Sequence, residues 1–225
     1  MNDCIHIFLD LNCMSVASIM NNSCELQNLN ELLVSASAGD SHAQFLLGFN
    51  YSIGKFDDKK DLYSAIHWFK EAIKQNNHNA MYALAALYFI ESPPFRKPSS
   101  SISLMARSAE LGNAKALYFM ACQYLKGEYV VLNNDVAITY LELAAIKNHI
   151  QSIFKLAQIF ESGEIVETNK AKALAFYKFA KELGHKNANE HKSKLILSMT
   201  KKDIDEFKKY SRIEKLLNKH FDEVA

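Results

Sequence analysis

The chain has 225 residues, 49% hydrophobic and 23% charged, a balance typical of a folded globular protein rather than a disordered one. Its formal net charge of +1 gives no bulk attraction to nucleic acid or to an acidic membrane surface. Three prolines and seven glycines are few for an all-β or loop-rich fold, so the composition favours helices.

An apolar stretch at residues 4–20 raises the question of a targeting segment. No Lys or Arg occurs before Lys55, and Asp10 interrupts the apolar run. A secretory signal begins with a basic region, so a cleaved signal is disfavoured. Nothing later in the chain reaches the ~18 to 20 apolar residues of a transmembrane helix. We therefore expect no membrane insertion and a cytoplasmic location, with secretion as an effector kept as an alternative.

The cysteines and histidines do not form a recognisable metal or catalytic motif. Cys4, Cys13, Cys24 and Cys122 lack CxxC spacing, which argues against zinc. Free thiols in a reducing compartment are the favoured interpretation, although an even count permits two disulfides. His185 and His191 are six residues apart, which does not place both on one helix face, and neither HExxH nor a Gly-rich phosphate loop occurs. We predict no catalytic residue, no bound metal and no cofactor.

Residues 109–124, AELGNAKALYFMACQY, contain a pattern that recurs every 36 or 37 residues. A small residue is followed by a large one four positions later, a small one at five and a ring at eight, which is one face of an α-helix. In chain order the four series are Ala43, Ala80, Ala116 and Ser152; Leu47, Leu84, Met120 and Leu156; Gly48, Ala85, Ala121 and Ala157; and Tyr51, Tyr88, Tyr124 and Phe160. Alternating small and large residues are typical of stacked helices, so we predict that the ring series is core and not a ligand-stacking surface.

Two further series define the ends of each unit. One holds a large side chain in step at 36 residues, at Trp68, Leu104, Tyr140 and Phe176. The other ends each unit with glycine or asparagine, at Gly39, Asn76, Gly112, Asn148 and Gly184. These two residue types suit a helix end where the backbone turns left-handed. Each unit therefore reads as helix, short loop, helix and turn, with Gly54, Gly127 and Gly163 at the mid-unit turns.

This pattern resembles the Sel1-like repeat, a relative of the tetratricopeptide repeat. The first unit reads AQFLLGFNYSIG (43–54) and AIHWFKEAIKQN (65–76), the third ALYFMACQYLKG (116–127) and AITYLELAAIKN (137–148). The second unit is the most degenerate, because its mid-unit glycine is replaced near Glu91. The resemblance implies an all-α fold: a right-handed α-solenoid of about four Sel1-like helix-turn-helix repeats with helical caps at both ends.

The expected domain organisation follows the repeat. It comprises an N-terminal segment and capping helix at 1–38, repeats at 39–75, 76–111, 112–147 and 148–184, and a degenerate half-repeat with a C-terminal capping helix at 185–225. The last helix, 201–224, places Ile204, Phe207, Ile213, Leu217 and Phe221 at helical spacing. End units of a solenoid need such caps because an open end exposes apolar surface.

The first helices of the units are expected to line a concave groove. Positions three and seven residues after the first small residue are not dictated by the repeat. They are Leu46, Asn50, Ala83, Leu87, Phe119, Gln123, Lys155 and Ile159. Five of the eight are apolar, and an exposed apolar row usually marks a binding site. Two interpretations stay open: a partner occupies the row, or the chain covers it with its own N-terminal segment or C-terminal helix.

The resemblance implies a non-catalytic adaptor or scaffold that binds a partner protein or peptide in this groove, including a bacterial effector-related or immunity-type variant. Asn-, Ile- and Lys-rich usage agrees with an AT-rich, bacterial genome. The alternative is a secreted cell-wall or β-lactam hydrolase of the cysteine-rich Sel1-like kind, which the lack of paired cysteines disfavours. Nine basic against six acidic residues in the C-terminal 34 are too weak an excess to predict nucleic-acid binding. The oligomeric state is left open.

Overall fold

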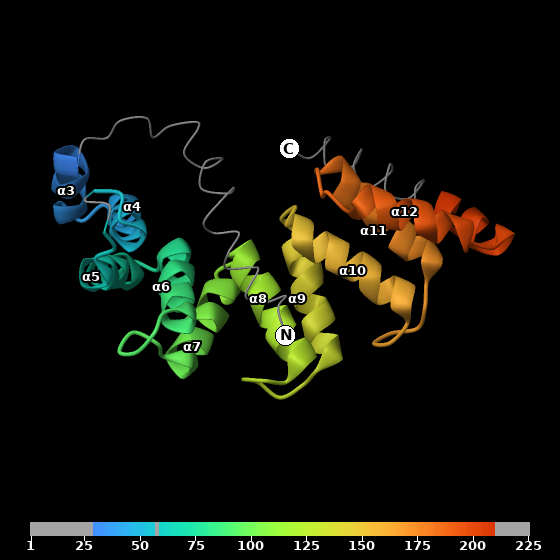
Figure 1. The fold of residues 1–225 in the computed structure, drawn as a ribbon, viewed down its shortest axis with the longest axis horizontal. Coiled ribbons are helices and arrows are strands. Elements are labelled where there is room, and N and C mark those ends of the chain that lie inside the picture. Colours follow the sequence, from blue (N-terminus) through green and yellow to red (C-terminus); the bar gives the residue numbers. More distant parts are fainter. Residues whose placement is uncertain (1–28, 57–58, 210–225) are drawn as a thin grey trace. The chain divides into compact units, whose positions relative to one another are not determined.

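The structure is a computed structural model that describes residues 29–56 and 59–209 (Figure 1). Within these ranges the regular structure is entirely helical, in successive helix-turn-helix units, as expected of a solenoid-like fold. The helices are α3 (Leu29–Ser37), α4 (Ser41–Ile53), α5 (Leu62–Lys74), α6 (His78–Ile90), α7 (Pro98–Glu110), α8 (Ala114–Lys126), α9 (Asn134–Ile146), α10 (Ile150–Ser162), α11 (Lys170–Glu182) and α12 (Ala188–Leu197), followed by a helical segment at 201–209. The predicted fold class is therefore confirmed.

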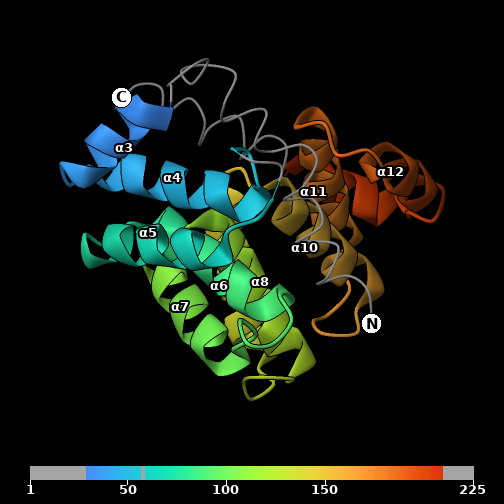
Figure 2. The same ribbon diagram turned by 60° about the vertical axis from the view of Figure 1, so that its left-hand side comes forward.

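The chain divides into two compact units. Unit 1 comprises residues 1–123 and 127–131, and unit 2 comprises residues 124–126 and 132–225. In unit 1, each helix from α3 to α7 contacts the next, and α4 also contacts α6 (Figure 2). In unit 2, α9, α10, α11 and α12 contact one another in the same sequential way. Neighbour-to-neighbour packing of this kind is what a repeat protein requires.

The turns between repeats have the backbone that the sequence predicts. All five boundary residues adopt positive φ: Gly39 at 98°, Asn76 at 59°, Gly112 at 83°, Asn148 at 58° and Gly184 at 90°. Glycine adopts this region without a steric cost, and asparagine tolerates it better than most residues. The boundary series is thus confirmed as a set of left-handed helix ends.

We expect Gly184→Ala to lower the free energy of unfolding by about 1 kcal/mol, because alanine is strained at φ 90°. A Cβ at Gly184 meets no atom within 4 Å, so the cost comes from the backbone alone. Urea denaturation measures it. Asn148→Gly, at the equivalent turn, is the control and should leave stability equal or slightly higher. Equal losses in both variants would contradict the backbone explanation.

The first helix of each repeat starts with a capping side chain that sequence inspection missed. Asp40, Asn77, Asn113 and His149 precede the first helices, and their side chains accept hydrogen bonds from the amide three residues later, at 2.6, 3.0, 3.0 and 3.3 Å. Such a cap satisfies an amide that has no partner within the helix. The caps also recur with the repeat period, and that recurrence was the available signal.

The same turns connect neighbouring repeats in unit 1. The Asn77 amide donates to the Ser41 carbonyl at 3.1 Å, and the Asn113 amide donates to Asn79 Oδ1 at 3.0 Å. Gln75 Nε2 donates to the carbonyl of Gly39 at 2.9 Å. Asparagine at this repeat position, as in Asn77 and Asn113, therefore both caps a helix and hydrogen-bonds it to the previous repeat.

The core of unit 1 contains the predicted first-helix residues Leu47 and Ala80, but on the second helix the buried ring is Phe69, one position after the predicted Trp68, which is only partly buried. Leu47 and Phe69 are 0% and 1% exposed, and Ala65, Ala72 and Ala80 around them are fully buried. Gly48 lies against the Phe69 ring so closely that a Cβ there would come within 2.8 Å of it. The small residues therefore let neighbouring helices approach, and the rings fill the remaining space.

Unit 2 repeats this packing and shows how the two aromatic series meet. Tyr124 stacks on Tyr140 with ring centroids 5.7 Å apart, and Phe160 stacks on Phe176 at 5.8 Å. In these two repeats the ring series packs against side chains of the second helices. Of the four rings predicted to be core, Tyr88 is buried, whereas Tyr51, Tyr124 and Phe160 are only partly buried.

The described parts of the expected caps do pack as caps. At the C-terminal end, Met199 and Phe207 pack on the buried cluster formed by Ala157, Ala173, Leu174, Tyr177 and Leu195. At the N-terminal end, Leu32 and Ala36 of α3 pack on Ala43 and Leu47. Residues 1–28 and the cap positions Ile213, Leu217 and Phe221 lie outside the described residues.

Candidate functional site

The candidate site is the inner row, which we define as the eight first-helix residues selected from the sequence. Its members are Leu46, Asn50, Ala83, Leu87, Phe119, Gln123, Lys155 and Ile159. The first six lie in unit 1, on α4, α6 and α8, and the last two lie on α10 of unit 2. The structure therefore places three pairs of the row in one unit and the fourth pair in the other.

Most of the row is buried within the chain. Asn50 and Leu87 are each 7% exposed, Ile159 is 2%, and Phe119 and Gln123 are fully buried. Leu46, Ala83 and Lys155 are partly buried. The repeat pattern does not dictate which residues stand at these positions, and it could not predict what packs on them.

Part of the burial has a visible cause in unit 1. Leu87 belongs to the cluster around Leu84 and Tyr88, so it is a core residue in its own right. Phe119 receives the edge of the Phe89 ring at a centroid distance of 5.3 Å. The Phe89 ring also meets Tyr129 at 5.6 Å, which links the row to the loop after α8.

Sequence inspection missed a further aromatic series beside the row. Phe45, Tyr82, Tyr118 and Phe154 occur two residues after the first small residue, in the same phase as the other series. Phe45 lies 6.3 Å from Phe69 and 6.4 Å from Phe49 between ring centroids. Burial raises the pKa of Tyr82, which therefore stays protonated at neutral pH. The 36-residue spacing was the signal that could have found this series.

Gln123 is the unusual member of the row. It is fully buried, yet neither its amide nitrogen nor its amide oxygen has a hydrogen-bond partner among the residues that the structure describes. A buried amide without partners costs about 1–3 kcal/mol. Buried polar groups are normally satisfied, which sets Gln123 apart from the other members of the row.

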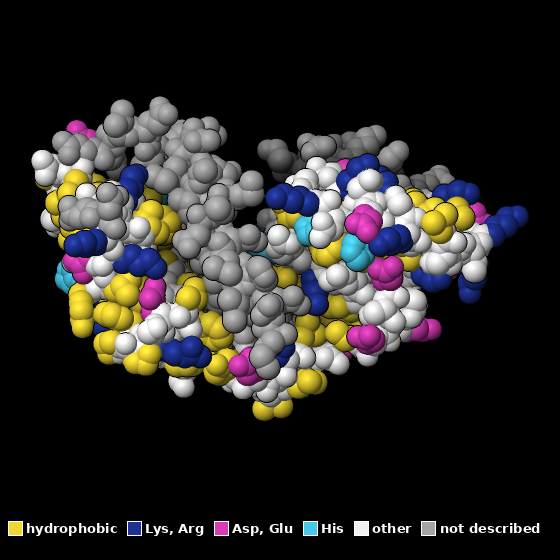
Figure 3. All heavy atoms as spheres, in the orientation of Figure 1, with side chains coloured by type: hydrophobic (Ala, Val, Ile, Leu, Met, Phe, Trp, Pro, Cys, Tyr) yellow, Lys and Arg dark blue, Asp and Glu magenta, His cyan; other side chains and the backbone are white. Residues whose placement is uncertain are grey.

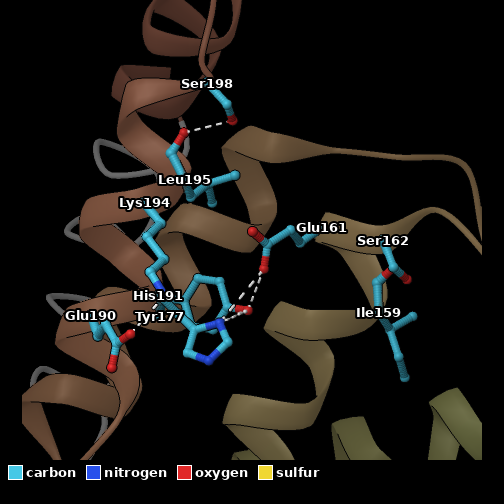
Figure 4. Close-up of polar contacts among 9 residues, drawn as sticks. All are labelled: Ile159, Glu161, Ser162, Tyr177, Glu190, His191, Lys194, Leu195 and Ser198. Carbon is cyan, nitrogen blue, oxygen red and sulfur yellow. Dashed lines mark hydrogen bonds and ion pairs between the residues drawn. The ribbon is translucent and has the colours of Figure 1, made fainter.

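A polar cluster in unit 2 joins α10, α11 and α12 (Figure 4). The Tyr177 hydroxyl donates to Glu161 Oε2 at 2.5 Å and lies 3.4 Å from His191 Nδ1. Burial and the bond to Glu161 together raise the pKa of Tyr177, so its proton is held firmly. We interpret this cluster as a structural tie between three helices.

The ring of Phe154 contacts two histidines, His185 and His191, whose spacing in the sequence does not predict that they lie together. His185 stacks on its ring at 3.8 Å, and His191 meets it edge-on at 5.2 Å. His185 Nε2 lies 3.1 Å from Gln151 Oε1, while its Nδ1 is buried without a partner among residues 29–56 and 59–209. Within these ranges, no group of histidine, cysteine and carboxylate side chains could hold a metal ion.

Burial, and secondarily the nearby His191, lower the pKa of His185 in the fold. The unfolded chain therefore binds more protons at mildly acidic pH. The contribution of neutral His185 to the free energy of unfolding is complete above about pH 6.5 and decreases as the pH drops below it. We expect the free energy of unfolding to decrease between pH 7 and pH 5, and His185→Gln to make that decrease smaller. Urea denaturation across this range measures both. An exposed control, His67→Gln, should keep the wild-type slope; an unchanged slope in His185→Gln would contradict the assignment.

Cys122 lies on α8 near the row, is 7% exposed, and forms no disulfide. Its burial is typical of a packing residue. Cys4, Cys13 and Cys24 lie outside the described residues.

Unit 1 also has an outer apolar surface, which Figure 3 shows at lower left over α5 to α7. Tyr63 is 72% exposed, and its ring meets Phe95 edge-on at 5.0 Å. Ile90 is 48% exposed. Singly exposed hydrophobic residues are ordinary on protein surfaces, so this area carries less weight than a buried unsatisfied amide.

Sequence comparison defines the family. The Sel1 repeat matches residues 41–77, 78–113, 114–149 and 150–185, which together span more than half of the chain. The protein therefore belongs to the Sel1 repeat family and contains four Sel1 repeats. Sel1 repeats typically mediate protein interactions. In the described part of the chain, no helix has the length and apolar character needed to span a bilayer.

Three similar proteins illustrate the range of the family. Chitin synthase regulatory factor 2 of Schizosaccharomyces pombe is 26% identical over 159 residues, covering 67% of this chain and 31% of its own length. A protective antigen of uropathogenic Escherichia coli is 21% identical with a TM-score of 0.71, covering 92% of this chain and 44% of that one. An immunity protein of Pseudomonas aeruginosa is 18% identical with a TM-score of 0.52, covering 84% and 69%. The chain thus spans about a third of the length of its yeast relative, and the two structures show a shared fold.

Proposed function

We propose that this protein is a non-catalytic adaptor that binds a partner protein or peptide along the inner row. The observation that carries the proposal is the buried, unsatisfied amide of Gln123. A glutamine amide offers one donor group and one acceptor, the complement of a peptide bond. The partly buried apolar members of the row in unit 1, Leu46 and Ala83, would supply the remaining contact area.

The contact would gain from burial and from satisfying the amide. Apolar area removed from water contributes about 25 cal/mol per Å², less the cost of ordering the partner. Satisfying the buried amide adds a term that the free protein lacks. A partner with an accessible backbone, either extended or at a loop, fits this chemistry better than a flat folded surface.

Two narrower roles follow from the similar proteins. A regulatory role would match the yeast relative, and a toxin-binding immunity role would match the structure from Pseudomonas. The immunity likeness concerns the fold, and one fold serves many functions. We favour the general adaptor role and propose a cytoplasmic location, because the buried Cys122 forms no disulfide and such a thiol suits a reducing compartment.

Affinity capture from an extract of the source organism tests the proposal. Gln123→Met keeps the shape of the side chain but removes the amide, so we expect it to lose the partner while retaining the fold. Ile146→Ser, at a 78% exposed position on α9, is the matched surface control and should keep the partner. Equal capture by both variants would contradict a role for the inner row.

A further inference from the structure

Basic residues are concentrated at the C-terminal end of unit 2. Residues 170–209, which contain α11, α12 and the helical segment at 201–209, include eleven lysines, no arginine and five acidic residues. This stretch therefore carries six excess positive charges, although the net charge of the whole chain is +1. Figure 3 shows several of these basic side chains around the right-hand end of unit 2. A local field of this sign attracts an anionic partner.

The turn between α12 and the helical segment at 201–209 also exposes aliphatic side chains. Leu197 is 88% exposed and Ile196 is 44% exposed. Leu197 lies on the side of α12 opposite to Ala188 and Leu195, which are buried, so its side chain projects into solvent. The turn therefore presents apolar surface that the described residues of unit 2 leave uncovered.

Lysines flank these aliphatic side chains. Lys170 Nζ donates a hydrogen bond to the Ser198 carbonyl at 2.7 Å, which places its ammonium group at the residue next to Leu197. Lys201 and Lys202 begin the following helical segment, and both are exposed. The turn thus combines projecting aliphatic groups with ammonium groups contributed by two helical elements.

Asp203 offsets part of this positive charge. Its carboxylate accepts hydrogen bonds from the Thr200 amide and hydroxyl, at 2.7 and 2.8 Å, and so caps the last helical segment. One carboxylate against Lys170, Lys201 and Lys202 leaves the turn positively charged.

The residue types of this surface distinguish among anionic partners. Proteins that bind single-stranded nucleic acid stack bases on aromatic rings and on arginine. Residues 170–209 contain no arginine, and their phenylalanine and tyrosine side chains are buried or partly buried, at Phe176, Tyr177, Phe179 and Phe207. Projecting aliphatic groups beside lysines are instead suited to the interface of an anionic bilayer, where the lysines attract headgroups and the aliphatic groups leave water.

We propose that the turn at residues 196–202 binds an anionic lipid surface. Ile196 and Leu197 enter the headgroup region, and Lys170, Lys201 and Lys202 contact the anionic headgroups. Within the described part of the chain no helix could span a bilayer, so the contact is peripheral. The turn shares no residue with the inner row, and this inference therefore does not depend on the proposed function.

Co-sedimentation of the full-length chain with lipid vesicles tests the proposal. One set of vesicles contains phosphatidylcholine with about 30% phosphatidylserine, and the other contains phosphatidylcholine alone. We expect the chain to bind the first set and not the second. Binding should also weaken when the salt concentration rises from about 0.1 M to about 0.5 M. Absence of binding to the anionic vesicles overturns the proposal.

Lys201→Gln with Lys202→Gln should weaken vesicle binding roughly twentyfold, because each lysine near an anionic surface contributes about fivefold. Lys59→Gln with Lys60→Gln is the matched control, since it removes the same charge from two adjacent exposed lysines of unit 1. This control should weaken binding less than about twofold, because salt screens charges that lie away from the contact. Equal losses in the two double variants overturn the assignment of the turn.

Leu197→Ser tests the apolar part of the contact and should weaken vesicle binding about tenfold, because an aliphatic side chain no longer leaves water. Val131→Ser, at an 87% exposed position in unit 1, should leave binding unchanged. Circular dichroism establishes that each variant is folded. Binding that is equal for Leu197→Ser and Val131→Ser overturns the entry of Leu197 into the lipid. Binding of a fluorescent polyglutamate peptide without binding of vesicles also overturns the proposal and assigns the surface to an acidic protein.

Discussion

Phe69→Ala is expected to lower the free energy of unfolding by about 3–5 kcal/mol, the largest loss among the substitutions considered in unit 1. Phe69 is 1% exposed at the centre of the cluster that joins α4, α5 and α6. Its removal loses the transfer free energy of the ring and leaves a cavity between alanines that cannot fill it. Urea denaturation of the full chain measures the change.

Tyr63→Ala on the same helix is the control for Phe69→Ala. Tyr63 is 72% exposed, so its loss should cost less than about 1 kcal/mol. Similar losses in both variants would show that Phe69 does not occupy the core in the way described.

A substitution at Gly48 tests the contact between this residue and the Phe69 ring. Alanine at Gly48 would bring its Cβ within 2.8 Å of the Phe69 ring, although alanine is accepted at the equivalent positions Ala85, Ala121 and Ala157. We expect Gly48→Ala to destabilise the wild type but to stabilise Phe69→Ala, since the methyl group then enters the cavity. A double-mutant cycle measures this coupling, and additive effects would contradict the contact.

Gln123→Met should raise the free energy of unfolding by about 1–2 kcal/mol, which is the opposite of the usual result for a fully buried position. The substitution removes two buried polar atoms that have no partner within the described ranges and keeps a similar volume. The expected gain in stability with a loss of binding is typical of a residue retained for function.

Gln44→Met provides the matched control. Gln44 is also buried, but its amide donates to the Ala36 carbonyl at 3.1 Å and accepts from Gln75 Nε2 at 3.0 Å. Removing this amide eliminates two formed hydrogen bonds, so this variant should lose about 1–3 kcal/mol. Opposite signs in the two variants support the assignment of Gln123. A loss in both would show that Gln123 has hydrogen-bond partners after all.

The sequence was sufficient to predict the fold because the same residue pattern recurs in every repeat. The phase shared by Ala80, Ala116 and Ser152 reflects helix packing, and the boundary glycines and asparagines reflect a backbone requirement. Both are local constraints that each unit must satisfy. The capping series and the ring series at Phe45 and Phe154 follow the same period, so they were also within reach.

The burial of the inner row could not be read from the repeat. Phe119 and Gln123 occupy positions that the pattern leaves free, and their exposure depends on what lies against α8. Phe119, for example, meets the ring of Phe89 on the preceding first helix, α6. In the same way, nothing in the spacing of His185 and His191 indicates that both meet the ring of Phe154. Contacts without a periodic signature are visible only in three dimensions.

Site-specific photocrosslinking tests whether the partner binds along the inner row. A photoreactive amino acid is placed at Leu46, Ala83 or Lys155, which are the partly buried members of the inner row, and at Lys74 and Ile146 on the second helices. We expect the partner to be crosslinked to the photoreactive residue at each of the first three positions and at neither of the other two. Crosslinks from Lys74 or Ile146 alone would show that the partner binds the second helices, and the inner row would then be a covered part of the core.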